Sequence, residues 1–272
     1  MKSLISIIMP SFNAGSYIQD AVNSVIHQSY SNWELLIIDD GSTDNTQDIL
    51  SQFNDHRIKI FSMSNNSGVS SARNVGLKYY QGKYLTFLDA DDMMPENSLL
   101  ARLEIFNKNP LVSFVDGKVV TFNSKLEQIK DSWTPKFMGN PFSELAKLSG
   151  KCFWGPSWLI KKQSIQNYSF NTNLTHGEDL LFYLQISQSP ERRYLYTNQE
   201  VLHHRTGHLS AMSNLDGLEE GYRKLFNLIK ENSNINLSQA LLFKRKSKSI
   251  MFKSFVHKFR FRSAFKVLLN DW

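Results

Sequence analysis

Short apolar segments alternate with helix-like segments through the first hundred or so residues of this chain. The apolar segments are rich in β-branched side chains, as buried parallel strands are, and cover residues 4–9, 33–38, 58–63, 84–88 and 112–115. The helix-like segments between them cover residues 17–27, 46–52, 70–80 and 95–107. This alternation predicts an α/β fold whose strands are joined by right-handed crossover helices.

Acidic residues follow two of the predicted strands. Asp39 and Asp40 end the second strand, and residues 89–92 (Asp-Ala-Asp-Asp) end the fourth. Because such sheets bind ligands at the carboxyl ends of their strands, these carboxylates are candidate site residues. Two carboxylates two residues apart suit Mg²⁺ or Mn²⁺, which prefer oxygen ligands. The alternative is a pair of solvated turn aspartates, with Asp92 capping the following helix.

No conventional nucleotide-binding loop follows the first predicted strand. Residues 10–15 read Pro-Ser-Phe-Asn-Ala-Gly, which is neither a dinucleotide fingerprint nor a lysine-containing phosphate loop. A bound diphosphate would therefore depend on a carboxylate-bound cation for charge neutralisation. The same turn disfavours nucleotidyl transfer, for which we would expect a basic, glycine-rich loop around the triphosphate.

Four segments, in this order, resemble the inverting family 2 glycosyltransferases, which have the GT-A (nucleotide-diphospho-sugar transferase) fold. They are residues 5–13 (ISIIMPSFN), 33–44 (WELLIIDDGSTD), 68–76 (GVSSARNVG) and 87–92 (FLDADD). The resemblance implies a Rossmann-like mixed sheet and the transfer of a hexose or N-acetylhexosamine from a UDP-sugar to a hydroxyl group. It also implies inversion of the anomeric centre and a Mn²⁺ or Mg²⁺ cofactor.

The resemblance assigns the donor site residue by residue. Phe12 would stack on the base, Asp40 would accept a hydrogen bond from it, and Arg73 would lie beside the base or the diphosphate. Asp89 would face the ribose and the cation, and Asp91 would bind the cation. Pro10, Asn13 and Ala90 complete the expected donor site. The alternatives are a core ring for Phe12 and a surface ion pair for Arg73.

An inverting displacement needs a general base within reach of the attacking hydroxyl. Residues 177–182 (GEDLLF) resemble the family's Glu-Asp element at a helix start, which makes Asp179 the expected base and Glu178 a neighbour that contacts the acceptor. We expect the helix start to lower the pKa of Asp179. The alternative is that both acids only favour the helix dipole.

Two tryptophans, Trp154 and Trp158, precede the expected base and are candidate platforms for acceptor sugar rings, or else core residues. The single cysteine, Cys152, is expected to be a buried hydrophobe in a protein of a reducing compartment. Residues 131–141 are expected to form a loop over the donor.

Residues 203–208 (HHRTGH) lack the carboxylates and helical spacing of a zinc site. In related enzymes a late motif contacts the cation or diphosphate. His203, His204 and Arg205 are the candidates for that role, and His204 is the one we select as a metal ligand.

Positive charge is concentrated at the carboxyl end of the chain. Residues 240–272 hold nine basic residues and one acid, whereas the preceding 239 residues hold 22 basic and 24 acidic ones. Apolar residues recur there at helical spacing, namely Met251, Phe255, Phe259, Phe261, Phe265, Leu268 and Trp272. Such a helix is typical of binding to an anionic membrane surface. It could instead dock on the body, and nucleic-acid binding is not expected because no binding module is present.

The predicted organisation is therefore a catalytic domain over residues 1–215 and a helical segment over residues 216–272, basic and amphipathic from about residue 240. The nucleotide-sugar half would cover residues 1–116 and the acceptor half residues 117–215. Because no signal peptide or membrane span is visible, we expect a cytoplasmic protein, and the basic tail suggests a peripheral position on the membrane. The resemblance and the tail together imply an enzyme acting on a lipid-linked saccharide in bacterial surface polysaccharide synthesis. The alternatives are a soluble glycosyltransferase acting on protein or free glycan, and a non-catalytic nucleotide-sugar-binding protein.

Overall fold

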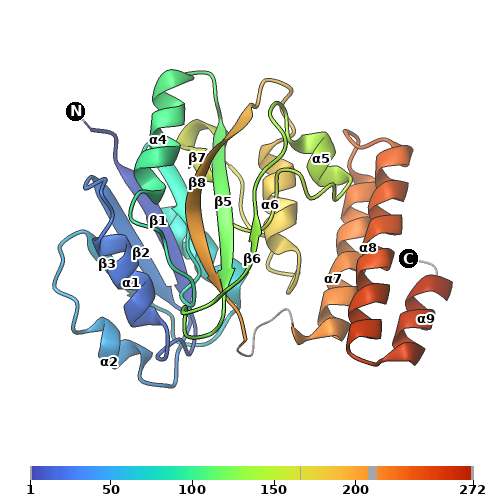
Figure 1. Cartoon of the computed structure of the whole chain (residues 1–272), viewed down its shortest axis with the longest axis horizontal. Helices are drawn as coiled ribbons and strands as arrows, with labels where there is room; N and C mark the ends of the chain where they lie inside the picture. The colour runs from blue at the N-terminus through green and yellow to red at the C-terminus, as the bar shows by residue number, and fades with distance from the viewer. Residues whose placement is uncertain (1, 166, 208–212, 271–272) are drawn as a thin grey trace.

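A computed structural model describes residues 2–165, 167–207 and 213–270 of the chain. Its centre is an eight-stranded mixed sheet in the order β3-β2-β1-β4-β7-β5-β6, with β8 paired to β5 (Figure 1). Helices cover both faces of the sheet, and three more helices stand beside one of these layers at the carboxyl end of the chain. The expected α/β fold with a helical carboxy-terminal extension is confirmed.

The first half of the chain follows the predicted alternation closely. Its parallel strands are β1 (Ile5–Ser11), β2 (Trp33–Asp39), β3 (Ile58–Ser62) and β4 (Tyr84–Phe87). The helices that connect or follow them are α1 (Ile18–Ile26), α2 (Thr46–Leu50), α3 (Val69–Tyr79) and α4 (Ser98–Lys108). The largest error in the predicted boundaries of this half is at α4, which begins three residues after the predicted start.

The second half departs further from the prediction. Its strands are β5 (Phe114–Phe122), β6 (Ile129–Trp133), β7 (Leu159–Lys161) and β8 (Tyr194–Arg205). Its helices are α5 (Phe142–Ala146), the 3₁₀ turn η1 (Lys162–Ser164) and α6 (Glu178–Ile186). The prediction that residues 131–141 form a loop is wrong at its start, because Asp131 and Trp133 pair with β5 as part of β6. The β6 sequence, Ile-Lys-Asp-Ser-Trp, is largely exposed and lacks the apolar run that marks buried strands.

Alternate residues of the central strands point into two hydrophobic cores. Ile7 and Ile37 pack in the core under α1 and α4, whereas Ile8 and Leu36 pack in the core under α3 and α6. Successive side chains of a strand point to opposite faces, so a strand covered on both sides must be apolar throughout. This accounts for the uninterrupted apolar runs in the sequence.

The carboxy-terminal helices are α7 (Leu215–Glu231), α8 (Leu237–His257) and α9 (Phe261–Leu269). One end of the α7–α8 pair, including Phe226 and Phe243, belongs to the core shared with α6. The other end, including Met251 and Phe255, forms a smaller core with α9. The first helix begins at Leu215, close to the predicted boundary.

The apolar residues of the basic tail differ in their burial. Met251 and Phe255 are fully buried, as expected if the tail docks on the body, whereas Phe259 is 83% exposed and Phe265 is 59% exposed. Trp272 lies outside the described residues. The docking interpretation therefore holds for the buried face of α8. Exposed apolar side chains lie on α9 and the turn before it, and also on α8, where Leu241 is 51% exposed. In the part of the chain that the structure describes, every helix is too short or too polar to cross a membrane.

Candidate active site

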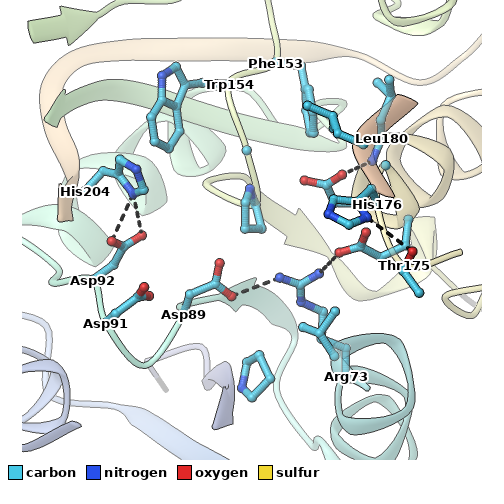
Figure 2. Close-up of a pocket in the computed structure, with 18 of the residues that line it drawn as sticks. Arg73, Asp89, Asp91, Asp92, Phe153, Trp154, Thr175, His176, Leu180 and His204 are labelled. Atoms are coloured by element: carbon cyan, nitrogen blue, oxygen red, sulfur yellow. Dashed lines mark hydrogen bonds and ion pairs between the residues drawn. The ribbon is translucent and has the colours of Figure 1, made fainter. Parts of the chain in front are cut away.

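A cleft of about 1140 Å³ lies at the carboxyl ends of the central strands. One side is built from the loops after β1, β2 and β4, and the other from α6 and the carboxy-terminal helices. All the predicted donor residues line it, as do Asp179, Glu178, Trp154 and His204. Figure 2 shows Asp91, Asp92 and His204 on one side of the cleft, and Thr175, His176 and Leu180 on the other.

The loop after β1 presents Phe12 to the cleft. The Phe12 side chain is 45% exposed, so the core-ring alternative is wrong. The loop is held by Asn13, whose side-chain oxygen accepts a 2.8 Å hydrogen bond from the backbone of Thr43 and whose own N–H donates to the Ser42 hydroxyl. Asn13 adopts a positive φ of 48°, which asparagine tolerates better than most residues. Pro10 and Ala90 also line the cleft.

Asp40 is 3% exposed and organises the loop before α3. Its two carboxylate oxygens accept hydrogen bonds from the backbone N–H groups of Ser67, at 2.8 Å, and Gly68, at 2.7 Å. Each oxygen keeps a second lone pair for another donor. Asp40 therefore has a structural role in the loop before α3. Its contact with a base stays a prediction.

Arg73 lies at the centre of the cleft floor and joins its two sides. The guanidinium Nη2 donates to Asp89 at 2.9 Å, and Nη1 donates to Glu178 at 2.9 Å, across 105 positions of sequence (Figure 2 labels Arg73 and Asp89). Only 4% of the Arg73 side chain is exposed, so the surface ion-pair alternative is wrong. Burial alone would lower the pKa of Arg73, but the charges of Asp89, Glu178 and Asp179 outweigh it and raise that pKa.

Asp179 stands at the start of α6 beside Glu178, and its Oδ1 accepts a 2.6 Å hydrogen bond from the backbone of Leu180. Burial, followed by the like charge of Glu178, raises the pKa of Asp179 to about 7, although Arg73 opposes the shift. The prediction of a lowered pKa is therefore wrong, because desolvation and a neighbouring carboxylate outweigh the helix start. A carboxyl group with this pKa exchanges protons near neutral pH, as a general base must.

Asp92 contacts the end of β8. Its carboxylate pairs with His204 Nδ1 at 3.0 Å and accepts a 2.9 Å hydrogen bond from the backbone of Arg205. Burial raises the pKa of Asp92 to about 6 even though His204 opposes the shift. Asp92 does not cap α4, whose N-cap residue is Asn97. The sequence gave no sign of this pairing, because 112 positions separate the two residues.

The three candidates of the late motif differ in their contact with the cleft. His203 does not line the cleft and pairs with Glu200 at 2.9 Å. His204 faces the cleft, and its ring lies 4.5 Å from that of Trp154. Arg205 also lines the cleft but is 4% exposed, and it donates to the backbone oxygen of Asp91 at 2.9 Å. His208 lies outside the described residues.

The two tryptophans also differ in whether they line the cleft. Trp154 lines the cleft, consistent with a platform for an acceptor ring. Trp158 is fully buried and donates from Nε1 to the backbone oxygen of Cys152 at 3.0 Å, so its predicted acceptor contact is wrong. Cys152 is buried as expected, and burial raises the pKa of its thiol.

The described residues contain no group of three or more histidine, cysteine or acidic side chains arranged to hold a metal ion. Asp89 and Asp91 nevertheless both line the cleft, and 35% of the Asp89 side chain is exposed. Mg²⁺ is commonly held by one or two carboxylates together with substrate phosphates. The donor set therefore fits a cation that arrives with a diphosphate, not a preformed metal centre.

Residues of α7 and α8 complete the cleft, which the sequence did not predict. Leu218 and Tyr222 come from α7 and Ile250 from α8. Tyr222 lies near the expected base, since burial and the charge of Asp179 raise its pKa to about 12. The only available signal was helical periodicity, which marks a packed helix without saying what it packs against.

The sequence profile of "Glycosyl transferase family 2" matches residues 6–169. The chain belongs to glycosyltransferase family 2. An uncharacterized glycosyltransferase of Haemophilus influenzae is 37% identical over 213 residues, which are 78% of this chain and 82% of that relative. The Escherichia coli enzyme WfgD, a UDP-Glc:alpha-D-GlcNAc-diphosphoundecaprenol beta-1,3-glucosyltransferase, is 36% identical over 183 residues, 67% of this chain and 69% of WfgD.

Solved structures share the fold at lower identity. S. aureus TarS in complex with UDP-GlcNAc matches with a TM-score of 0.70 and 19% identity, covering 94% of this chain and 73% of that one. The mannosyltransferase PcManGT from Pyrobaculum calidifontis, in complex with GDP-Man and Mn2+, matches with a TM-score of 0.67 and 15% identity, covering 98% and 74%. The family 2 enzyme described here thus has the GT-A fold expected from its motifs.

We predict that Arg73→Met lowers the free energy of unfolding by about 3–5 kcal/mol, because it leaves Asp89 and Glu178 without their buried partner. Urea unfolding at pH 7 measures the change. Arg223→Met is the matched control, since Arg223 pairs with Glu219 on an exposed face of α7, and we expect it to change stability by less than about 1 kcal/mol. Equal effects of the two substitutions would contradict the central role of Arg73.

Proposed function

We propose that this family 2 enzyme transfers a hexose or N-acetylhexosamine from a UDP-sugar to a hydroxyl group of a lipid-linked saccharide, with inversion and with a divalent cation. The reaction would serve bacterial surface polysaccharide synthesis. The observation that carries the proposal is the common cleft of Asp89, Asp91 and Asp179. Candidate cation ligands and a carboxyl group whose pKa is raised to about 7 both line this cleft, which supports the proposal.

The comparisons support the donor and acceptor parts of the proposal. The name of WfgD gives a UDP-sugar donor and a diphosphoundecaprenol-linked acceptor, and a TarS structure holds UDP-GlcNAc. A Bacillus subtilis relative, 48% identical over 105 residues, is named as a putative teichuronic acid biosynthesis glycosyltransferase. The Mn2+ in the complex of PcManGT supports a divalent cation.

The residues of the cleft suggest how each group would act. The exposed Phe12 ring offers a face for base stacking, and Asp89 and Asp91 would hold Mn²⁺ or Mg²⁺. When bound, the cation supplies positive charge that stabilises the departing diphosphate. Arg73 adds fixed positive charge at the floor of the cleft, next to Asp89. His204 lies on the same side and would contact the diphosphate or the cation.

In the proposed reaction the acceptor oxygen attacks the anomeric carbon while the bond from that carbon to the diphosphate oxygen breaks. The hydroxyl proton passes to a carboxylate oxygen of Asp179, and UDP leaves. Glu178 is held by Arg73 at 2.9 Å, so it would keep the neighbouring Asp179 in place. Glu178 would also contact the acceptor. Trp154 would provide a surface for the acceptor ring.

We expect the transfer rate to rise with pH through about 7. Asp179 accepts a proton only when ionised, so below its raised pKa the rate should fall about tenfold per pH unit. Asp179→Asn keeps the size and the hydrogen bond from Leu180 but cannot act as a base, so transfer should collapse while donor binding persists. Initial rates between pH 5 and 9, with calorimetric binding of UDP, measure both. Near-normal transfer by the variant would remove Asp179 from the base role.

Asp91→Asn should abolish the cation-dependent part of donor binding. A ligand that binds only the folded protein raises the midpoint of thermal unfolding, so UDP with Mn²⁺ should raise that of the unsubstituted protein more than UDP with EDTA. The variant should show the same small rise under both conditions. Asp131→Asn, on exposed β6, is the matched control. An unchanged response in Asp91→Asn would contradict the proposed cation site.

We also propose that α9 attaches the enzyme to an anionic membrane surface. Phe261 is 53% exposed and Phe265 is 59% exposed, and Arg262 and Lys266 lie beside them in the sequence. Exposed aromatic rings among basic residues favour binding at an anionic lipid interface. Truncation before Phe243 is a poor test, because it would remove a fully buried residue of the main core.

Changing both Phe261 and Phe265 to serine should release the protein from phosphatidylglycerol vesicles in a sedimentation assay, without changing the unfolding midpoint. Leu111→Ser, at a site that is 87% exposed before β5, should sediment like the unsubstituted protein. Undiminished sedimentation of the double variant would place membrane binding elsewhere.

A further inference from the structure

One end of the cleft, next to Asp179, has hydrocarbon walls. Leu148 follows α5, Leu180 comes from α6, Leu218 from α7 and Ile250 from α8, so four separate parts of the chain contribute. Leu180 and Leu218 are each less than a tenth exposed, whereas Ile250 is 38% exposed. The apolar lining therefore extends from the region of the expected base to the surface of α8.

Close contacts fix α7 against the segment that leads to Asp179. Gly217 and Gly221 are one helical turn apart, and both face His176. A Cβ atom at Gly221 would lie 2.7 Å from the backbone oxygen of His176, so a larger residue would push α7 away. This close packing makes α7 a fixed part of the cleft.

Two hydrogen bonds fix α8 against α5. Lys246 Nζ donates to the backbone oxygen of Leu148 at 3.1 Å, and Gln239 donates to the Ser143 hydroxyl at 3.1 Å. Both contacts lie on the face of α8 that carries Ile250. The apolar end of the cleft is thus a built surface, not the side of a loosely attached tail.

Positive charge flanks this apolar surface on α8. Lys246 lies four residues before Ile250 and Lys253 three residues after it, so helical geometry places all three on one face. A neutral sugar would use neither the lysines nor the hydrocarbon walls. The combination matches a ligand that has both an anionic phosphate group and an alkyl or isoprenoid chain.

We infer that this end of the cleft binds the hydrocarbon chain of a phosphate-linked acceptor, with the chain on Leu148, Leu218 and Ile250 and the phosphate against Lys253. The inference rests on the proposed function and assigns the carboxy-terminal helices to acceptor recognition.

Two probes that differ only in chain length test the inference, ethyl diphosphate and undecyl diphosphate. Their binding to the full-length protein is measured by calorimetry below micelle formation, with UDP and Mn²⁺ saturating the donor site. We expect undecyl diphosphate to bind about tenfold more tightly or better, because apolar area is buried. Ile250→Ser should reduce this preference severalfold, whereas Lys253→Gln should weaken both probes alike. Leu111→Ser and Lys108→Gln, at the far end of α4, are the matched controls.

Equal affinity for the two probes, or an unchanged preference in Ile250→Ser, would overturn the inference. A preference lost in Phe265→Ser but kept in Ile250→Ser would place the chain on α9 and overturn it as well. Retained UDP binding shows that the variants are folded. Absence of sugar transfer by the unsubstituted protein would contradict the proposed function but would leave the chain-length measurement intact, so the two failures are distinguishable.

Discussion

The ion pairs of Arg73 hold the two sides of the cleft together. Its guanidinium is buried and bonds to Asp89, at the end of β4, and to Glu178, at the start of α6. A buried charge is tolerated only when it is paired, and breaking such a pair is strongly destabilising. The position of Asp179 relative to the end of β4 therefore depends on Arg73 as well as on the core packing of α6.

Asp179 differs from Asp89 and Glu178 in its contact with Arg73. Three acids surround one arginine, and Arg73 bonds to Asp89 and Glu178 but not to Asp179. Asp179 is left with burial and a like charge, which raise its pKa to about 7. In the proposed reaction Glu178 positions Asp179, and Asp179 takes up the proton.

Local patterns predicted the first half of the chain well, because a strand buried on both faces is apolar throughout and its connecting helices are amphipathic. They also placed Asp40, Asp89 and Asp91 at one sheet edge, whereas Arg73 and the Gly-Glu-Asp element were assigned from the resemblance to family 2. Long-range features were not predictable. The contact between Asp92 and His204, the burial of Trp158 and the position of Ile250 depend on packing between distant segments. The pKa of Asp179 was predicted in the wrong direction because the sequence shows a helix start but not the burial around it.

The measurement that most directly tests this account is a double-mutant cycle between Arg73→Met and Glu178→Gln, followed by urea unfolding at pH 7. If the ion pair joins the two sides of the cleft, the free energy changes of the single variants will not add. The coupling energy should then be about 0.5–3 kcal/mol, as for residues in direct contact. Additive changes would show that Arg73 and Glu178 act independently, and would contradict the claim that Arg73 positions the catalytic end of α6.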